Sequence, residues 1–251
     1  MAEKDTPNGE PCNEIPGEAP LQDWRFHGRR HGRRLRAGME QLLRDWLPVL
    51  QMTLPPGDVE IVPDALFPGP VSDLWMEIGF GAGEHFAWQV EHNPEVGLIG
   101  CEPFMNGVAS LMRHLEGLGR DPAALNVRIL ADDVRPMLKR LAPGSFGRIC
   151  VLFPDPWPKT RHAERRIIQN ESVAQLRDLL RPGGELRLAT DDMNYARWML
   201  QRLTAHQGLR WLARRPGDWR DRPEDWPATR YENKAVAVGR RPAFLRFVRV
   251  D

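Results

Sequence analysis

Cysteine is scarce in this sequence, and the few cysteines are widely spaced. The three cysteines, Cys12, Cys101 and Cys150, form no C-x-x-C pair and no cysteine–histidine spacing typical of a metal site, which argues against structural zinc. Cys101 and Cys150 lie in apolar runs, where a thiol behaves as a small hydrophobic side chain. We therefore expect no metal site in this protein.

Long apolar segments are missing as well. No uninterrupted apolar run approaches the length of a membrane span, and the first residues lack the basic start and apolar stretch of a signal peptide. The formal net charge is only +1, which excludes a surface that coats polyanions throughout. Any nucleic-acid contact must therefore come from local clusters of arginine. We expect a cytoplasmic protein without membrane contact.

The chain divides into a tail and one domain. Residues 1–22 are rich in Pro, Glu and Gly, which predicts a disordered acidic tail. Residues 23–251 are interpreted as one domain that begins with a basic arm and a helix over 38–49. The arm, residues 25–36, has six arginines and two histidines in twelve positions. Such an arm is either a solvated basic segment or a phosphate-binding one, since arginine matches phosphate oxygens bidentately.

Apolar runs at strand and helix periodicity alternate along the domain. We predict strands at 74–78, 96–101, 127–130, 148–153, 185–189, 209–214 and 244–250, and further helices at 86–92, 105–118, 135–141, 172–180 and 195–206. Strands that alternate with helices form a mostly parallel sheet with helices on both faces, which is the α/β class.

A glycine-rich turn follows the first predicted strand. Gly79, Gly81 and Gly83 come directly after Glu77 and open the next helix, so a ligand can approach the backbone closely. This spacing alone is weak, because dinucleotide enzymes use a similar turn. A carboxylate at the strand end favours an ammonium group over a pyrophosphate, which prefers exposed amides. The turn therefore favours S-adenosylmethionine over NAD.

Carboxylates end the other predicted strands too. In an open sheet of this kind, ligands bind beyond the carboxyl ends of the strands. We expect Glu102 to meet ribose hydroxyls and one of the adjacent pair Asp132 and Asp133 to accept from an adenine amine. Five acids fall at such ends: Glu77, Glu102, Asp133, Asp155 and Asp191. Their convergence on one rim predicts a binding site. The pair Thr190-Asp191 has a second interpretation, as the N-cap of the following helix.

The loop F-P-D-P-W-P-K at 153–159 is the most informative stretch of the chain. Pro154 and Pro156 flank Asp155 and restrict it to an extended conformation. Trp157 either stacks on a base or packs over the core. We interpret the basic residues that follow as phosphate contacts; the alternative is a solvated basic surface. These residues are Lys159, Arg161, Arg165 and Arg166.

Together these motifs resemble the bacterial tRNA (guanine-N(7)-)-methyltransferase family. The resemblance covers nearly all of residues 23–251, through E-I-G-F-G at 77–81, F-P-D-P-W-P-K at 153–159, T-D at 190–191 and T-R-Y-E at 229–232. It implies the class I S-adenosylmethionine-dependent methyltransferase fold, which is Rossmann-like. That fold has a seven-stranded, mostly parallel sheet with helices on both faces and the last strand antiparallel.

The resemblance also implies which residues bind what. The methyl donor S-adenosylmethionine would be bound by Glu77, Gly79, Gly81, Glu102, Asp133 and Asp155, of which Asp155 would also be catalytic. A guanosine in the variable loop of tRNA would be bound by Lys159, Asp191, Thr229, Arg230, Tyr231 and Glu232. We expect tRNA as the partner and a monomer, with a homodimer as the alternative.

The chain departs from the family pattern near its end. Tyr231 replaces the usual phenylalanine, which keeps the ring, and Asn233-Lys234-Ala235 replaces the usual basic residue and glycine. The second departure puts a phosphate contact in doubt, with Lys234 or Arg240 as substitutes.

Guanine N-7 has an in-plane lone pair and no proton, so its methylation requires alignment rather than a general base. We interpret Asp155 as a residue that orients the purine and stabilises its positive charge, with Asp191 and Glu232 as other candidates. The alternatives are an exocyclic-amine RNA base methyltransferase and a non-catalytic RNA-binding module. An NAD-linked oxidoreductase is disfavoured by Glu77.

Overall fold

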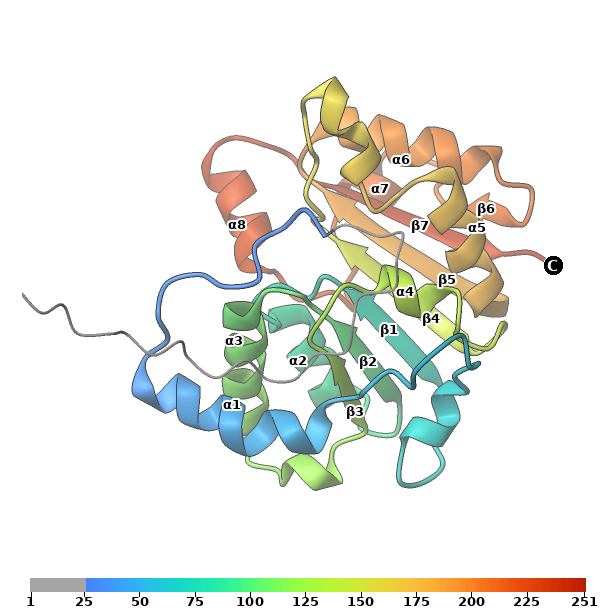
Figure 1. Cartoon of the computed structure of the whole chain (residues 1–251). Helices are drawn as coiled ribbons and strands as arrows, with labels where there is room; N and C mark the ends of the chain where they lie inside the picture. Colours follow the sequence, from blue (N-terminus) through green and yellow to red (C-terminus); the bar gives the residue numbers. More distant parts are fainter. Residues whose placement is uncertain (1–25) are drawn as a thin grey trace, which may run out of the picture.

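One seven-stranded sheet with the order β3-β2-β1-β4-β5-β7-β6 forms the centre of the molecule (Figure 1). The computed structural model describes residues 26–251, so the predicted tail at 1–22 lies outside the described residues. The strands are β1 (Leu74–Ile78), β2 (Gly97–Cys101), β3 (Val127–Leu130), β4 (Phe146–Leu152), β5 (Leu180–Thr190), β6 (Leu209–Trp211) and β7 (Ala243–Arg249). Strands β1 to β5 pair in parallel, and β7 runs antiparallel to both of its neighbours. The predicted sheet is confirmed.

Helices connect the strands on both faces of the sheet (Figure 1). The α-helices are α1 (Ala37–Leu50), α2 (Glu84–His92), α3 (Met105–Glu116), α4 (Arg135–Leu138), α5 (Asn170–Leu179), α6 (Met193–Ala205), α7 (Gly217–Arg220) and α8 (Arg230–Ala237). The described residues also form the 3-10 helices η1 (Pro63–Leu66), η2 (Pro122–Ala124) and η3 (Thr160–Arg165). None of the helices within residues 26–251 is long and apolar enough to cross a membrane.

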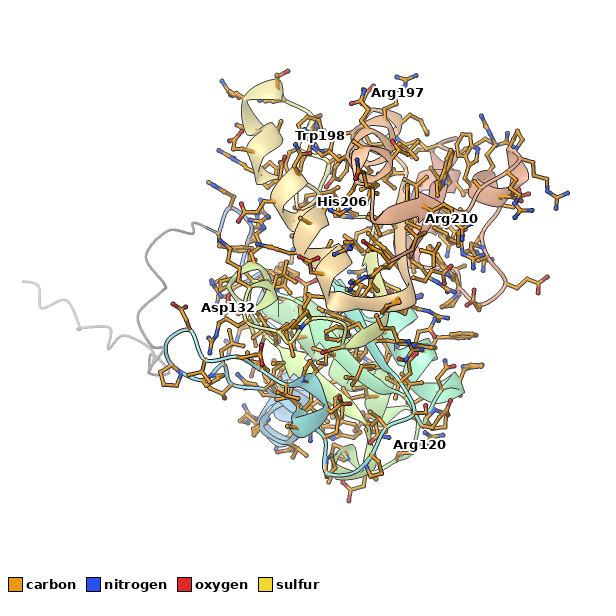
Figure 2. The ribbon with its side chains drawn as sticks, turned by 90° about the vertical axis from the view of Figure 1, so that its right-hand side faces the viewer. Arg120, Asp132, Arg197, Trp198, His206 and Arg210 are labelled. Atoms are coloured by element: carbon orange, nitrogen blue, oxygen red, sulfur yellow. The ribbon has the colours of Figure 1, made fainter. Side chains whose placement is uncertain are left out.

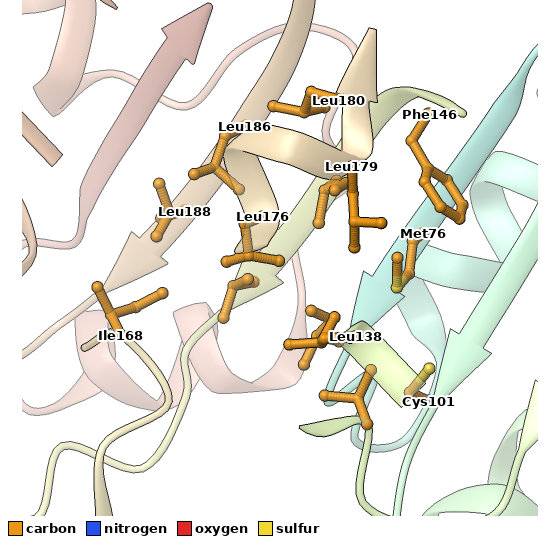
Figure 3. Close-up of a cluster of buried hydrophobic side chains, with 14 of the residues drawn as sticks. Met76, Cys101, Leu138, Phe146, Ile168, Leu176, Leu179, Leu180, Leu186 and Leu188 are labelled. Carbon is orange, nitrogen blue, oxygen red and sulfur yellow. The ribbon is translucent and has the colours of Figure 1, made fainter. Parts of the chain in front are cut away.

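The alternation of side chains along each strand produces a hydrophobic core on each face. On β2, Ile99 and Cys101 belong to one core and Leu98 to the other, as period-two geometry requires. The first core fills the space between the sheet and helices α4, α5 and α6, and Figure 3 shows its part between the sheet, α4 and α5. The second lies beneath α2 and α3, with α1 packed along α3. Apolar side chains therefore fix both layers of helices on the sheet.

Some element boundaries differ from those predicted. Helix α4 ends at Leu138 rather than at 141, because the chain turns into an isolated parallel bridge between Ile61 and Leu141. Strand β5 begins at Leu180, which pairs with Phe146 before a register shift. Strand β6 ends at Trp211 instead of at 214. Each difference comes from pairing with a distant strand or bridge, which local periodicity does not report.

The strand order reverses between β1 and β4, which are neighbours in the sheet. At such a switch point the connections leave in opposite directions and open a crevice beyond the carboxyl ends of the strands. The glycine turn after β1 and the Asp155 loop after β4 both lie at this crevice.

Candidate active site

A pocket of about 550 Å³ lies at the carboxyl ends of β1 to β4. Four of the five predicted acids line it: Glu77, Glu102, Asp133 and Asp155. Other predicted site residues in the lining are Gly79, Gly81, Thr229 and Tyr231. The lining does not include Lys159, Asp191, Arg230 or Glu232. Within residues 26–251, no group of three or more His, Cys, Asp or Glu side chains could hold a metal ion.

The glycine turn forms the floor of the pocket and is held by Glu102. Gly79 and Gly81 have φ values of 72° and 58°, a region that side chains rarely adopt. The Glu102 carboxylate accepts hydrogen bonds from Gly81 N at 2.8 Å and Phe104 N at 2.9 Å. Burial raises the pKa of Glu102 above its usual value, against the lowering effect of these N–H groups. A Cβ at Gly107 on α3 would lie 2.3 Å from Gly81 O, so its absence lets the helix touch the turn.

Glu77 is paired with a residue that the sequence did not single out. His85, in the first turn of α2, places Nδ1 2.7 Å from Glu77 Oε2, and both residues are buried. Its other ring nitrogen, Nε2, lies 3.2 Å from Gln89 Nε2. A polar residue in the first turn of a helix usually faces water, so the sequence carried little signal for this contact.

Asp132 and Asp133 separate clearly in the structure. The Asp133 side chain is 11% exposed. Asp132, labelled in Figure 2, is 52% exposed and forms an ion pair with Arg30 at 2.7 Å. Asp133 also accepts a hydrogen bond from Arg135 N at 2.9 Å. Both carboxylates line the pocket, but Asp133 is the more buried, whereas Asp132 is engaged by the basic arm.

The described part of the basic arm forms one wall of the pocket. Phe26 to Arg29 contribute to the lining. Met105 N donates to Arg30 O at 2.8 Å, and Asn106 bonds both Gly32 N and Arg33 O at 2.7 Å. The arm is thus docked on the N-terminal end of α3, a contact between distant segments that composition alone did not predict.

The loop after β4 is strained at both ends. Phe153 and Trp157, which bracket Pro154 to Pro156, have φ values of 50° and 41°, and bulky residues seldom adopt a positive φ. Such strain persists only where the surroundings impose it, and it concentrates at functional sites. The Asp155 side chain is exposed, but the surrounding protein displaces part of its hydration, and this desolvation raises the pKa of the carboxyl above the usual value.

Arg166 imposes the conformation of this loop. Its Nε and Nη2 donate to Pro156 O at 2.8 Å and Trp157 O at 3.2 Å. The buried guanidinium lies over the rings of Tyr195 and Trp198, at 5.2 and 4.5 Å from their centroids. Arg202 covers Trp198 at 3.2 Å. The expectation that Arg166 contacts phosphate is therefore wrong: it is a buried support of the Asp155 loop.

The remaining cations after the loop are more accessible. Lys159 and Arg161 are exposed, and Arg165 lies over the Trp157 ring at 5.1 Å from its centroid. Trp157 lines the pocket and is partly buried. Trp157 thus packs against Arg165 and borders the pocket at the same time.

The C-terminal segment reaches the pocket through helix α8. Thr229 is the N-cap of α8, accepting from Glu232 N at 3.3 Å. The Tyr231 ring lies over the glycine turn, 3.0 Å from where a Cβ on Gly81 would be. Glu232 pairs with Arg222 at 3.1 Å, and Arg230 lies 3.6 Å from Glu84.

Asp191 lies at the end of β5 and pairs with Arg240 at 2.9 Å. The alternative that Thr190-Asp191 caps the next helix is wrong, because Asp192 is the N-cap of α6 and accepts from Asn194 N and Tyr195 N. Asp191 therefore connects the end of the sheet to the segment after α8.

Comparisons with known proteins identify close relatives. Residues 72–244 match a family model described as "Putative methyltransferase". The chain is 50% identical over 234 residues to the "tRNA (guanine-N(7)-)-methyltransferase" of Rhodospirillum rubrum, with 92% of this chain and 90% of that protein covered. It is 47% identical over 235 residues to the protein of the same name from Paramagnetospirillum magneticum, with 93% and 96% covered. A solved structure described as "Structure of an Antibiotic Related Methyltransferase" is 14% identical, covering 78% of this chain and 95% of that chain, with a TM-score of 0.48.

Proposed function

The chain belongs to the tRNA (guanine-N(7)-)-methyltransferase family, and we propose that it transfers a methyl group from S-adenosylmethionine to N-7 of a guanosine in tRNA at this pocket. The observation that carries the proposal is the gathering of four carboxylates around one pocket at the switch point of the sheet: Glu77, Glu102, Asp133 and Asp155. A ligand with an ammonium group, ribose hydroxyls and an exocyclic amine offers hydrogen-bond donors to the first three.

The residues present fit such a nucleoside. The pocket volume of about 550 Å³ lies within the range of small-molecule sites. The turn at Gly81 is already held by Glu102, so little backbone ordering remains to oppose binding. We assign Glu77 to the ammonium group, Glu102 to the ribose and Asp133 to the adenine amine. Gly79 and Gly81 allow the ligand to approach the backbone.

The chemistry asks for alignment and charge rather than for a base. S-adenosylmethionine, when bound, supplies a methyl group on a positively charged sulfur. Guanine N-7 has no proton to lose, and its methylation makes the purine cationic. Asp155 borders the pocket and would stabilise that charge. It would also accept from the N-1 and amino hydrogens, which distinguishes guanine from adenine.

The substrate tRNA would approach over the exposed cations and helix α8. Thr229 and Tyr231 reach the pocket, and Lys159 and Arg161 are exposed and follow Trp157, which lines it, within four residues along the chain. Asp191 forms an ion pair with Arg240, and Glu232 forms one with Arg222. We therefore assign these two acids to orienting the arginines toward RNA, and Arg230 to the same RNA-binding surface. The proposed target is a guanosine in the variable loop.

A methylation assay tests the proposal. Incubation of the full chain with unmodified tRNA and S-adenosylmethionine should yield 7-methylguanosine, detected by mass spectrometry of the digested RNA and mapped to the variable loop. A matched tRNA with 7-deazaguanosine should accept no methyl group, because it lacks N-7. Methyl incorporation into this tRNA would point to an exocyclic amine instead. Retention of tRNA without any methylation would contradict enzymatic activity.

Lys159 provides a test of the tRNA surface. No carboxylate lies within ion-pair distance of its ammonium group in the described chain, whereas Lys139 is paired with Glu171 at 3.0 Å. Lys159→Met should weaken tRNA binding and reduce the slope of log K against log salt by about 1 unit, because one phosphate contact is lost. Fluorescence titration across salt concentrations measures this slope. An equal change in the Lys139→Met control would refute a specific role for Lys159.

A further inference from the structure

A chain of buried hydrogen bonds begins at Glu77 and His85, which both line the pocket, and continues to Gln89, which does not. His85 Nδ1 lies 2.7 Å from Glu77 Oε2, and its Nε2 lies 3.2 Å from Gln89 Nε2. Gln89 Nε2 also donates to the backbone carbonyl of Asp225 at 3.1 Å. Glu77, His85 and Gln89 are 5%, 3% and 3% exposed, so water does not compete for these contacts.

Two neighbours fix the orientation of the Gln89 amide. The Asp225 carbonyl can only accept a hydrogen bond, so it must face the NH₂ group of Gln89. Asn93 Nδ2 donates to the backbone carbonyl of Gln89 at 3.1 Å and to its Oε1 at 3.0 Å. Both contacts require the same amide orientation, with the NH₂ group directed at His85.

The Asp225 carbonyl is itself held in place. The Asp225 carboxylate pairs with Arg187 at 2.7 Å and Arg148 at 3.6 Å. The adjacent Trp226 is buried and meets the His85 ring edge-on, with centroids 6.1 Å apart. The acceptor that orients Gln89 therefore cannot easily turn away.

The Gln89 orientation determines the protonation of His85. Because Gln89 presents an N–H group, His85 Nε2 must accept and carries no proton. The single ring proton then resides on Nδ1 and is donated to Glu77. The imidazole is neutral, so the Glu77–His85 pair keeps a net charge of −1. A protonated histidine would cancel the charge of Glu77.

We propose that His85 is a positioning residue for the methyl donor, and that Gln89 keeps it in the neutral Nδ1–H form. One Glu77 oxygen is held by His85, while the negative charge remains for the ammonium group of the donor's amino-acid part. This inference rests on the proposed function, since it assigns the pocket to S-adenosylmethionine. It predicts that the pair recognises the charged tail of the ligand and not its nucleoside.

The affinities for two ligands distinguish this positioning role of His85 from a general structural role in the pocket. S-adenosylhomocysteine has the ammonium group, and 5′-methylthioadenosine lacks the amino-acid part. His85→Leu should weaken binding of S-adenosylhomocysteine about tenfold to hundredfold, the effect of losing a hydrogen bond to a charged group. It should leave the affinity for 5′-methylthioadenosine within about twofold. His85→Asn should restore most of the loss, because its amide can donate from near the Nδ1 position.

Calorimetric titration of the full chain measures these affinities, with His92→Leu as the matched control. His92 lies on the same helix, but its ring is exposed and stacks on Trp88. Equal losses for both ligands in His85→Leu would overturn the inference in favour of general support, and no loss for either would overturn it outright. If the unaltered chain bound neither ligand, the proposed function itself would fail.

The protonation state has its own measurement. Nitrogen-15 spectra of the imidazole should show a protonated Nδ1 and an unprotonated Nε2 at neutral pH. Gln89→Met removes the N–H donor, so it should disturb this pattern and weaken S-adenosylhomocysteine while sparing 5′-methylthioadenosine. A cationic His85 ring in the unaltered chain would overturn the inference.

Discussion

Replacement of Asp155 by Asn should lower the single-turnover rate of methyl transfer by about 10²–10³-fold at saturating tRNA and donor, the cost of removing one preorganised charge-stabilising group. The amide keeps the size of the side chain and removes the charge that opposes the developing cation on the purine. Affinity for S-adenosylhomocysteine should change far less, because Glu77 and Glu102 remain. Rapid-quench measurement of 7-methylguanosine gives the rate.

Asp58→Asn is a matched control, since Asp58 is exposed and does not line the pocket. Its rate should equal that of the unaltered chain. An Asp155→Asn variant with a nearly full rate would refute the catalytic role. Glu232 or Asp191 would then be the next carboxylates to test.

The pH dependence follows from the same residue. Desolvation raises the pKa of the Asp155 carboxyl above its usual value. On acidification Asp155 therefore loses its charge at a higher pH than an ordinary aspartate. The rate of methyl transfer should therefore be maximal above this raised pKa and should decrease as the pH falls through it. This acidic limb should disappear in Asp155→Asn.

Much of the fold could be predicted because its signals are local. The apolar runs at 74–78 and 127–130 coincide with β1 and β3, since each strand is buried and bounded by turn residues. The clustering of the acids at the strand ends could also be predicted, because the carboxyl ends of parallel strands lie at the same edge of a sheet. That argument depends on topology alone and needs no side-chain geometry.

Contacts between distant segments could not be predicted in the same way. The sequence gives Arg166 as one of several cations, and only the fold shows that Tyr195 and Trp198 bury it beneath the loop. Likewise, in the sequence His85 and Gln89 look like ordinary polar residues of a helix. Only the fold shows that the backbone carbonyl of Asp225, far along the chain, accepts from Gln89 and so orients both side chains. Protonation and burial are set by such partners, so they are invisible to local patterns.

Replacement of Gly107 by Ala should destabilise the protein, although Ala is the better helix former. The change gains about 1 kcal/mol in intrinsic helix propensity. Against this, the new Cβ would lie 2.3 Å from Gly81 O, a backbone atom that cannot rotate away. The turn is also held by Glu102, so relief requires α3 or the turn to move. We expect the free energy of unfolding to decrease by about 1–3 kcal/mol net, as for an overpacked core.

The same displacement should weaken the donor site. Movement of the turn would misalign the hydrogen bonds that Glu102 and the glycine turn offer to the ligand. Affinity for S-adenosylhomocysteine should therefore fall by about tenfold to hundredfold, the effect of losing one hydrogen bond to a charged group. Unlike the His85 variants, Gly107→Ala should also weaken 5′-methylthioadenosine, because the turn supports the whole ligand. Urea unfolding and calorimetric titration measure the two effects.

Gly38→Ala isolates the steric cause. Gly38 also lies in a helix, α1, but a Cβ there meets nothing within 4 Å. This variant should gain about 0.5–1 kcal/mol in unfolding free energy, since only propensity and chain entropy change. Opposite signs for one substitution in two helices would show that contact with Gly81 O, and not helix formation, requires glycine at 107. Equal signs would mean that the turn yields to α3 at little cost, and that its geometry is not what holds the donor.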